Sequence, residues 1–429
     1  MIEIIIGLVA IISIVALFLS VLVITKKNKD TFESNIDKSK WNKLGQDLRV
    51  PGTYFGWSVS LSNDGNIVAI YSGSKNMVKV YEWNGSVWTQ LGQDLLGNDN
   101  NDHFGWSVSL SGDGSVIAIG APISNAPAQT DVDKSGYVKI YKLHCSKWKQ
   151  LGQDIEDKEK GDRFGWSVSL SDDGNRVAIS AIGDKNLTGK VKIYELNNDD
   201  CYCKPLWTQL GIEIKGNNEN DYLGWSVSLS GDGETVAIGA PGSNNKSGKV
   251  NIHKWNGGTK WNFSHVFNGD LEYATHLGNS VSLSKDGNIV AFCAYAQNNE
   301  STVNGKVNKR YPGSDNNGKV KVYKLNGSVW TQLGQDAFGV NNRFVSLSGD
   351  GNKIAIGYPD PPIENPNNKN GKVKVYKLND NVWTQYGKDI EGNSGDYLGF
   401  SPSLSKDGTY VAAGSPGNGK ANVYILTKI

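Results

Sequence analysis

The sequence predicts an all-β protein, a seven-bladed β-propeller of four-stranded antiparallel blades, preceded by one transmembrane α-helix. The first reason is a phrase close to FGWSVSLSxDGxxVAIGAP, which recurs seven times. An Asp-Gly pair marks each copy, and its aspartates are Asp64, Asp113, Asp173, Asp232, Asp286, Asp350 and Asp407. Consecutive copies lie 49 to 64 residues apart, which fits four strands and their loops, so each repeat is expected to form one blade.

A second marker, a tryptophan followed in most copies by Gln-Leu-Gly or a relative of it, is out of phase with the first. It begins at Trp41, Trp88, Trp148, Trp207, Trp261, Trp330 and Trp383. Trp41 has no FGW phrase before it, and the last copy, which contains Gly399, has no such tryptophan after it. We therefore expect residues 41–46 to supply the fourth strand of blade seven and to close the ring.

The second repeat shows how the strands follow from the residue pattern. Large and small side chains alternate over residues 106–111, as they do in a strand, and Asp113-Gly114 is a tight reversal. The remaining three strands are expected at residues 116–119, 137–141 and 148–151. The same reasoning places three strands of blade seven at residues 399–405, 409–414 and 421–427.

The connections between strands divide between the two faces of the ring. The turns between strands one and two, and between strands three and four, are short and share one face. The connections that leave strands two and four share the other, here called the long-loop face. Its longest segments are expected at residues 122–136, 295–318 and 358–371. Loops held on a rigid scaffold commonly carry binding sites.

Composition and charge narrow the functional classes. The 44 basic and 43 acidic residues give a formal net charge of +1, which argues against nucleic acid as a main partner. The chain has 51 glycines, as expected for a turn-rich all-β protein, and 13 tryptophans and 18 tyrosines that must supply much of its core.

The N-terminal region differs physically from the repeats. Residues 4–24 carry no charge and, as a helix rising about 1.5 Å per residue, would match a bilayer core of about 30 Å. A cleaved signal peptide is the competing interpretation, but only Glu3 precedes the apolar run and no small-residue cleavage site follows it. The sequence is therefore divided into a transmembrane helix (1–25), a charged tether (26–40) and a propeller (41–429), with the lipid bilayer as a partner of residues 4–24.

The orientation in the membrane is left open by conflicting signals. Lys26, Lys27 and Lys29 follow the apolar run, and the positive-inside rule would place the propeller on the cytoplasmic side. Six Asn-x-Ser/Thr sequons would suit an extracellular or lumenal propeller; they begin at Asn84, Asn186, Asn245, Asn262, Asn299 and Asn326. The protein is expected to be a single-pass membrane protein, and both locations of its propeller, cytoplasmic and extracellular or lumenal, are kept as hypotheses.

Four cysteines do not form a disulfide framework. Cys293 lies in an apolar strand and is expected to pack as a small hydrophobic residue. Cys145 shares a hairpin position with Cys201 and Cys203 of the next repeat, so either unpaired thiols or a bridge between blades would fit this spacing. A metal site with the adjacent His144 is a further alternative, although the spacing fits no standard zinc pattern.

The repeat resembles the FG-GAP repeat of integrin α-chain propellers and related adhesion proteins. The residues that carry the resemblance are Phe55-Gly56, Phe104-Gly105, Phe164-Gly165, Leu223-Gly224, Leu277-Gly278 and Leu398-Gly399, together with Gly120-Ala121-Pro122 and Gly239-Ala240-Pro241. The resemblance implies a surface-exposed binding propeller more often than an enzyme. Calcium-binding blades of that family carry four carboxylates in a D-x-D-x-D-G-x-x-D loop, whereas residues 60–68 keep only Asp64. We expect no metal site there and interpret the Asp of each copy as a turn residue.

Two groups of side chains are candidate ligand-binding residues. The long blade-five connection combines aromatic and charged residues of types that are common at protein interfaces, namely Tyr295, Lys309, Arg310, Tyr311 and Asp315. The second group occupies one position in blades one to four and consists of Trp57, Trp106, Trp166 and Trp225, with Phe400 at that position in blade seven. It is interpreted either as an aromatic arc near the channel mouth or as wedges packed between blades.

A third set, Asp102, Asp162, Asp221 and Asp396, lies two residues before the FG step. Each is interpreted as a cap of the local turn, with a cation-binding ring of carboxylates as the alternative.

The sequence offers little support for catalysis. None of the five histidines lies in a nucleophile or metal motif, and no phosphate-binding motif is present. We therefore expect a non-catalytic binding propeller with no cofactor, which recognises a protein or glycan ligand at the long-loop face. The alternatives are an inward-facing membrane scaffold for protein assembly and a glycan-acting enzyme in the propeller channel.

Overall fold

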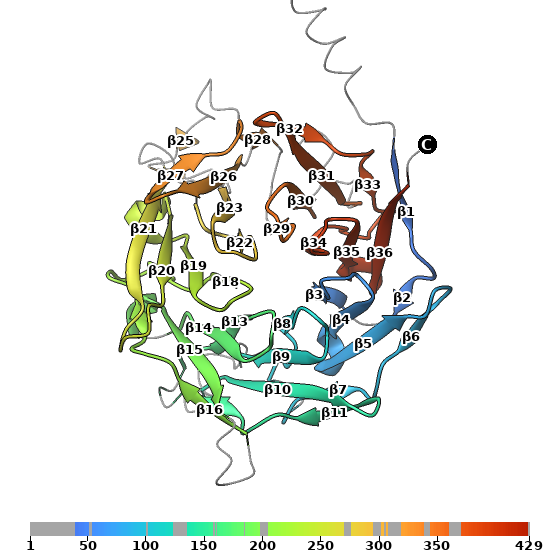
Figure 1. Ribbon diagram of the computed structural model, residues 1–429, viewed down its shortest axis with the longest axis horizontal. Helices are drawn as coiled ribbons and strands as arrows, with labels where there is room; N and C mark the ends of the chain where they lie inside the picture. The colour runs from blue at the N-terminus through green and yellow to red at the C-terminus, as the bar shows by residue number, and fades with distance from the viewer. Residues whose placement is uncertain are drawn as a thin grey trace, which may run out of the picture.

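The computed structural model describes residues 39–50, 54–99, 102–122, 135–157, 159, 161–183, 185–197, 205–269, 276–294, 302–303, 306–307, 319–338, 344–359 and 370–427. Seven antiparallel sheets stand around one central axis, as the ribbon in Figure 1 shows. The all-β fold and the seven blades predicted from the repeats are confirmed.

The first two strands of each blade form its inner half. The strands nearest the axis, in blade order, are β3 (Phe55–Leu61), β8 (Ser107–Leu110), β13 (Phe164–Leu170), β18 (Ser226–Leu229), β22 (Val281–Leu283), β29 (Phe344–Leu347) and β34 (Phe400–Leu404). The second strands are β4 (Ile67–Ser72), β9 (Val116–Ala121), β14 (Arg176–Ala181), β19 (Thr235–Ala240), β23 (Ile289–Ala294), β30 (Lys353–Tyr358) and β35 (Tyr410–Ser415).

The third and outer strands complete the blades. The third strands are β5 (Met77–Trp83), β10 (Tyr137–His144), β15 (Lys190–Asn197), β20 (Lys249–Lys254), β26 (Lys319–Asn326), β31 (Lys372–Asn379) and β36 (Lys420–Thr427). The outer strands are β6 (Trp88–Gln90), β11 (Lys147–Gln150), β16 (Leu206–Gln209), β21 (Asn262–Asn268), β27 (Val329–Gln332), β32 (Val382–Gln385) and β1 (Lys40–Lys43).

Short elements surround this framework. Six outer strands are followed by a two-residue strand that pairs with the same third strand, namely β7 (Leu95–Leu96), β12 (Ile155–Glu156), β17 (Ile214–Lys215), β28 (Ala337–Phe338), β33 (Ile390–Glu391) and β2 (Leu48–Arg49). The other short elements are β24 (Thr302–Val303), β25 (Lys306–Val307), α2 (Ser243–Lys246), η1 (Gly73–Lys75), η2 (Lys185–Leu187) and η3 (Pro416–Asn418).

The two ends of the described chain meet in blade seven. Strand β1 pairs antiparallel with β36, with Lys40 opposite Thr427 and Lys43 opposite Tyr424. In Figure 1 the two strands lie side by side at opposite ends of the colour scale. In addition, the Trp41 indole Nε1 donates to the carbonyl of Tyr386 in blade six at 2.9 Å.

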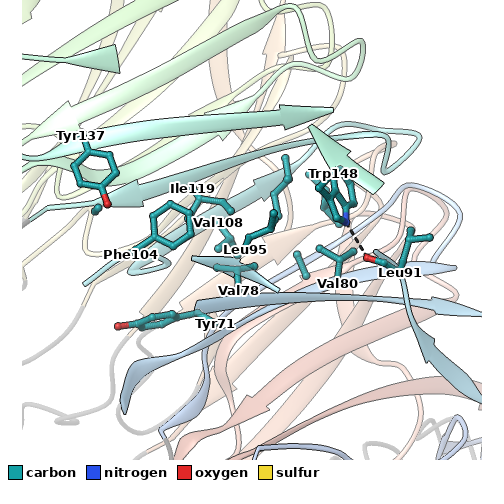
Figure 2. Close-up of a cluster of buried hydrophobic side chains, with 14 residues drawn as sticks. Tyr71, Val78, Val80, Leu91, Leu95, Phe104, Val108, Ile119, Tyr137 and Trp148 are labelled. Carbon is teal, nitrogen blue, oxygen red and sulfur yellow. Dashed lines mark hydrogen bonds between the residues drawn. The ribbon is translucent and has the colours of Figure 1, made fainter. Parts of the chain in front are cut away.

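The hydrophobic core is divided among the spaces between neighbouring blades. Figure 2 shows the cluster between blades one and two, where Val78 and Val80 of β5 face Val108 and Ile119 of blade two. Phe104 of the second FG phrase has no solvent exposure in this cluster. The phenylalanine of the FG phrase thus fixes one blade against the preceding one by burying apolar surface.

The serines of the repeat connect the inner strands across the blade junctions. The backbone N–H of Val108 donates to the Ser58 hydroxyl of blade one at 3.2 Å, and the N–H of Leu110 donates to Ser60 at 3.0 Å. Equivalent bonds occur at every junction, including that between Leu61 and Ser403 at 3.0 Å. An inner strand is a sheet edge with unpaired donors, and the serine hydroxyls satisfy part of that edge.

A second ring of hydrogen bonds passes through the short turns between strands one and two. The residue before each turn aspartate donates its N–H to the equivalent carbonyl of the next blade, at 2.7 to 2.9 Å. The seven residues are Asn63, Gly112, Asp172, Gly231, Lys285, Gly349 and Lys406. At about 4.8 Å per step the backbone ring is about 11 Å across, so this end of the channel is narrow.

The tryptophans of the second marker link the outer strands. The Nε1 of Trp148 donates to the carbonyl of Leu91 at 2.8 Å, as the dashed line in Figure 2 shows. Five further junctions carry the same bond, made by Trp41, Trp88, Trp207, Trp261 and Trp383. The buried Nε1 of Trp330 is the exception in this set, since it has no hydrogen-bond partner among the residues that the structure describes.

Within the ranges that the structure describes, no helix is long and apolar enough to cross a membrane. Residues 4–24 and the tether up to residue 38 lie outside those ranges, as do Cys201 and Cys203. Cys293 in β23 is fully buried, which confirms its predicted role as a core residue, and burial raises the pKa of its thiol to about 12.

Candidate functional site

In blades two to five the FG phrase forms a turn at the long-loop end of the channel. In blade two the N–H of Trp106 donates to the carbonyl of His103 at 2.9 Å, and Gly105 has a φ of 103°. Such a turn needs a glycine at its third position because L-residues rarely adopt that φ. A Cβ on Gly105 would also lie 2.3 Å from the ring of Tyr71 in blade one.

The residue after the FG glycine leaves this turn towards the channel. The rings of Trp57, Trp106, Trp166 and Trp225 contact one another in blade order, with centroids 5.6, 5.0 and 5.1 Å apart. Trp57 is 36% exposed, and the other three are partly buried. The tryptophans therefore pack across blade junctions and still present surface to solvent.

Two phenylalanines extend this row of rings. The ring of Phe400 lies 4.9 Å from that of Trp57, and the ring of Phe344 lies 5.5 Å from that of Phe400. Phe344 occupies the position of the serine after the tryptophan, so sequence alignment alone did not identify it. We call these six side chains the aromatic arc; they are Trp225, Trp166, Trp106, Trp57, Phe400 and Phe344.

The arc is interrupted at blade five. Asn279 follows the FG glycine there in place of an aromatic residue. The long connection that was predicted to contact a partner belongs to the same blade. It starts after Ala294 of β23 and ends before Lys319 of β26. The five residues predicted in it, Tyr295, Lys309, Arg310, Tyr311 and Asp315, lie outside the described residues.

The residues directly before the FG phrase in the sequence form a second set of side chains, here called the rim. It consists of Tyr54, His103, Arg163, Tyr222, His276 and Tyr397, which are all planar groups with a polar end. All except Tyr54 have a left-handed backbone with φ between 45° and 57°. This conformation costs an L-residue about 1 to 2 kcal/mol, and strain of this kind is concentrated at functional sites.

The rim residues lie close to the arc. His103 and Tyr222 stand edge-on to Trp106 and Trp225, at centroid distances of 6.0 and 5.9 Å. Burial lowers the pKa of His103, although the charge of Asp102 opposes this effect. The uncharged imidazole is therefore favoured at neutral pH, and it both donates and accepts hydrogen bonds.

The buried aspartates before the FG phrase hold the rim backbone. In blade two the Asp102 carboxylate accepts the N–H groups of Phe104 at 3.0 Å and Asn98 at 2.8 Å, together with the Tyr137 hydroxyl. Asp221 and Asp396 likewise accept backbone N–H groups, from Asn218 and Asn393 respectively. These bonds confirm the interpretation as turn caps.

Lysines of the third strands neutralise three of these carboxylates. Lys249 lies 3.0 Å from Asp221, Lys420 lies 2.7 Å from Asp396, and Lys190 lies 3.3 Å from Asp162. The aspartates are at most 2% exposed. The charges of these three aspartates are therefore paired with lysines inside the blades.

Blade three has the densest of these ion-pair networks. Lys190 is 1% exposed and also contacts Asp157 at 2.9 Å and Glu159 at 2.8 Å, while Lys192 contacts Asp157 at 2.8 Å. Burial raises the pKa of Asp162, although the charge of Lys190 opposes the shift. For Asp157, burial also acts to raise the pKa, but bonds to Lys192 and Lys190 outweigh it and lower the pKa. Asp162 of this network directly precedes the rim residue Arg163 in the sequence.

At the opposite end of the channel, the turn aspartates have local partners. Asp113 accepts the Ser111 hydroxyl at 2.7 Å and the Ser115 N–H at 2.9 Å, and the other six copies repeat the serine bond. Their carboxylates thus make the bonds of turn residues.

Comparisons with known proteins agree with this architecture. A family model described as the FG-GAP repeat matches residues 96–140, 156–194 and 215–252, which fall in blades two to four. No curated protein sequence matches the chain. Among solved structures, the chain is similar to Kuenenia stuttgartiensis hydrazine synthase, with a TM-score of 0.57 and 13% identity over 90% of this chain and 99% of that chain.

At that identity the similarity to hydrazine synthase concerns the fold alone. The repeat matches in three places, the FG turns and the seven-bladed ring together support an FG-GAP β-propeller.

Proposed function

We propose that the protein is a membrane-tethered, non-catalytic binding propeller that recognises a protein or glycan ligand at its long-loop face. The observation that carries this proposal is the aromatic arc, six rings in sequential contact that keep surface open at one end of the channel. Large rigid aromatic side chains contribute much binding energy at little cost in conformational entropy.

The two ends of the channel support different roles. The short-turn end has a closed circle of seven backbone hydrogen bonds. Two residues of this circle, Asp172 and Lys285, also form an ion pair through their side chains. A ligand is therefore expected to approach from the long-loop face, where the arc and the rim meet solvent. In this proposal a ligand enters the channel only at its long-loop end.

The membrane tether is the second part of the proposal. Residues 4–24 have the length and apolarity of a single span, and β1 begins shortly after them at Lys40. We further propose that β1, through its pairing with β36, closes the ring and joins it to the tether. An inward-facing scaffold is the second candidate, favoured by the lysines at positions 26, 27 and 29.

Protease protection of the intact membrane-bound chain, tagged at its C-terminus, separates these two candidates. Digestion without detergent is expected if the propeller faces outwards to bind extracellular ligands. Protection until detergent is added would overturn the outward orientation and support the inward-facing scaffold.

Binding by the arc is tested by substitution in the full chain. The Trp166→Ala variant removes a ring from the middle of the arc and is expected to lose at least tenfold in affinity for a ligand found by screening glycans and cell-surface proteins. Trp83→Ala is the matched control, since Trp83 is also partly buried but lies on a third strand, away from the arc. Equal affinities of the two variants would contradict a binding role for the arc.

A further inference from the structure

The repetition of the arc and the rim carries information on the ligand. In blades two to four the same unit recurs, a planar polar residue, the FG turn and a tryptophan, at His103 to Trp106, Arg163 to Trp166 and Tyr222 to Trp225. Blade one presents Tyr54 and Trp57 at the same positions. Four equivalent subsites in a row fit a ligand that is itself built from identical units.

The chemistry of each subsite is an apolar face beside a polar edge. Each tryptophan is partly exposed and offers aromatic surface, on which C–H groups pack. The rim residue offers an O–H or N–H group within one turn of it. A pyranose has this combination, since one face carries C–H groups and its edge carries hydroxyls.

Charge and spacing favour a glycan over other ligands that bind aromatic surfaces. Arg163 is the one formally charged rim residue, which does not suit nucleic acid. A polyproline helix repeats an apolar face every three residues, about 9 Å. The tryptophan centroids are only 5.0 to 5.6 Å apart, close to the length of one pyranose unit.

The strain in the rim backbone also points to ligand contact. Glycine would adopt the left-handed conformation without cost, yet the chain places His103, Arg163 and Tyr222 there, at φ of 56°, 57° and 52°. The side chains are not needed for the turn, because its hydrogen bond joins backbone atoms. Non-glycine residues that reduce the stability of the fold are expected at such positions where their side chains bind a ligand.

We propose that the arc and rim of blades one to four bind a neutral oligosaccharide of repeating units, with one sugar at each tryptophan. This proposal rests on the proposed binding function and specifies its ligand. Affinity increases with the number of sugars up to four, because each added unit occupies one further subsite, and then levels off.

The test uses the full chain in detergent micelles and titrations by calorimetry. The probes are uncharged cello- and chito-oligosaccharides of one to six units, with a neutral glycan array to extend the search. The expected result is an affinity that rises at least tenfold between two and four units and changes less than twofold between four and six. Trp225→Ala removes the last subsite and moves the plateau from four units to three, whereas Trp83→Ala leaves it at four.

A rim variant separates a binding role from a structural one. Tyr222→Gly relieves the left-handed strain, so it is expected to keep or increase thermal stability while weakening tetrasaccharide binding about tenfold. Loss of stability with unchanged affinity would overturn the role of the rim. A ligand that is a protein, or a glycan affinity independent of chain length, overturns the oligosaccharide proposal and leaves the binding function standing. Absence of any ligand overturns both.

Discussion

The backbone N–H of Lys406 in blade seven donates to the carbonyl of Asn63 in blade one at 2.8 Å. This bond joins the last and first short turns and completes a circle in which each of the seven blades both donates and accepts one hydrogen bond. Local movement of one blade would break two bonds of the circle. We therefore expect the seven blades to unfold as one cooperative unit.

Removal of the N-terminal strand tests whether β1 holds the ring together. A chain lacking residues 1–46 loses the β1–β36 pairing and the Trp41 bond to Tyr386, whereas a chain lacking residues 1–38 keeps both. The shorter chain is expected to unfold in a single transition about 10 °C lower. Differential scanning calorimetry measures the difference. Equal melting temperatures, with proteolysis confined to blade seven, would show that the pairing does not stabilise the ring.

The tryptophan bonds between outer strands can be measured by a matched pair of substitutions. Trp148→Phe removes a buried donor bonded to Leu91, and Trp330→Phe removes a buried donor that has no partner. Both variants lose similar apolar volume, so the bond accounts for the difference. Trp148→Phe is expected to reduce the free energy of unfolding by about 1 kcal/mol more than Trp330→Phe. Urea denaturation gives both values, and a larger loss for Trp330→Phe would contradict the assignment.

The FG glycine is expected to tolerate no side chain. Gly105→Ala places an L-residue at a φ of 103° and a Cβ 2.3 Å from Tyr71. Conformational strain of about 1 to 2 kcal/mol and overpacking of about 1 to 3 kcal/mol should add. In Gly85→Ala, by contrast, φ is 95° but nothing lies within 4 Å of the new Cβ, so only the strain is expected. Equal destabilisation of the two variants would show that the contact with Tyr71 relaxes freely.

The turn aspartates predict how the fold responds to acid. Six of them have a pKa below the ordinary value of 3.8, namely Asp64, Asp113, Asp173, Asp286, Asp350 and Asp407. Partial burial acts to raise each pKa, but hydrogen bonds from a Ser or Thr hydroxyl and from a backbone N–H outweigh it. Because the folded pKa is the lower one, the stabilisation is fully present above about pH 4 and is lost as the pH falls through the folded pKa.

A serine variant tests this linkage. Ser111→Ala removes the hydroxyl bond to Asp113, so its loss of unfolding free energy should be larger at pH 7 than at a pH below the folded pKa of Asp113, where the carboxylate is protonated in either chain. Ser109→Ala is the control, because the Ser109 hydroxyl accepts the N–H of Leu170 and contacts no carboxylate in the described hydrogen bonds. Its loss should be independent of pH. A pH-independent loss in both variants would contradict the role of the turn carboxylates.

Sequence periodicity was sufficient to predict the blades. The alternation of residues 106–111 and the Asp113-Gly114 reversal led to strands that the structure places at Ser107–Leu110 and Val116–Ala121. Such features are local, because side-chain alternation and turn residues act over a few neighbours. Repetition then supplied the global architecture, since seven similar units that each leave an apolar face uncovered bury it by packing in a ring.

The tertiary structure was needed for everything that depends on contacts between blades. The serines of the repeat were assigned only to strand alternation, but their hydroxyls accept N–H groups of the next blade, as Ser58 does from Val108. Nothing in a single repeat indicates this partner. Contacts within a blade can also need the tertiary structure: the residues of the Asp221–Lys249 pair lie 28 positions apart in blade four and meet only after that blade has folded.

The candidate site divides in the same way. The sequence by itself determined which tryptophans share a position, because equivalent residues of a repeat occupy equivalent places. Only the tertiary structure decided that Trp57 contacts Phe400 from the other end of the chain, that Phe344 joins the row, and that the residues before the FG phrase adopt a strained backbone. The physical reason is that repetition fixes a residue's place within its blade, whereas ring contacts and backbone strain arise from the way neighbouring blades pack around the axis.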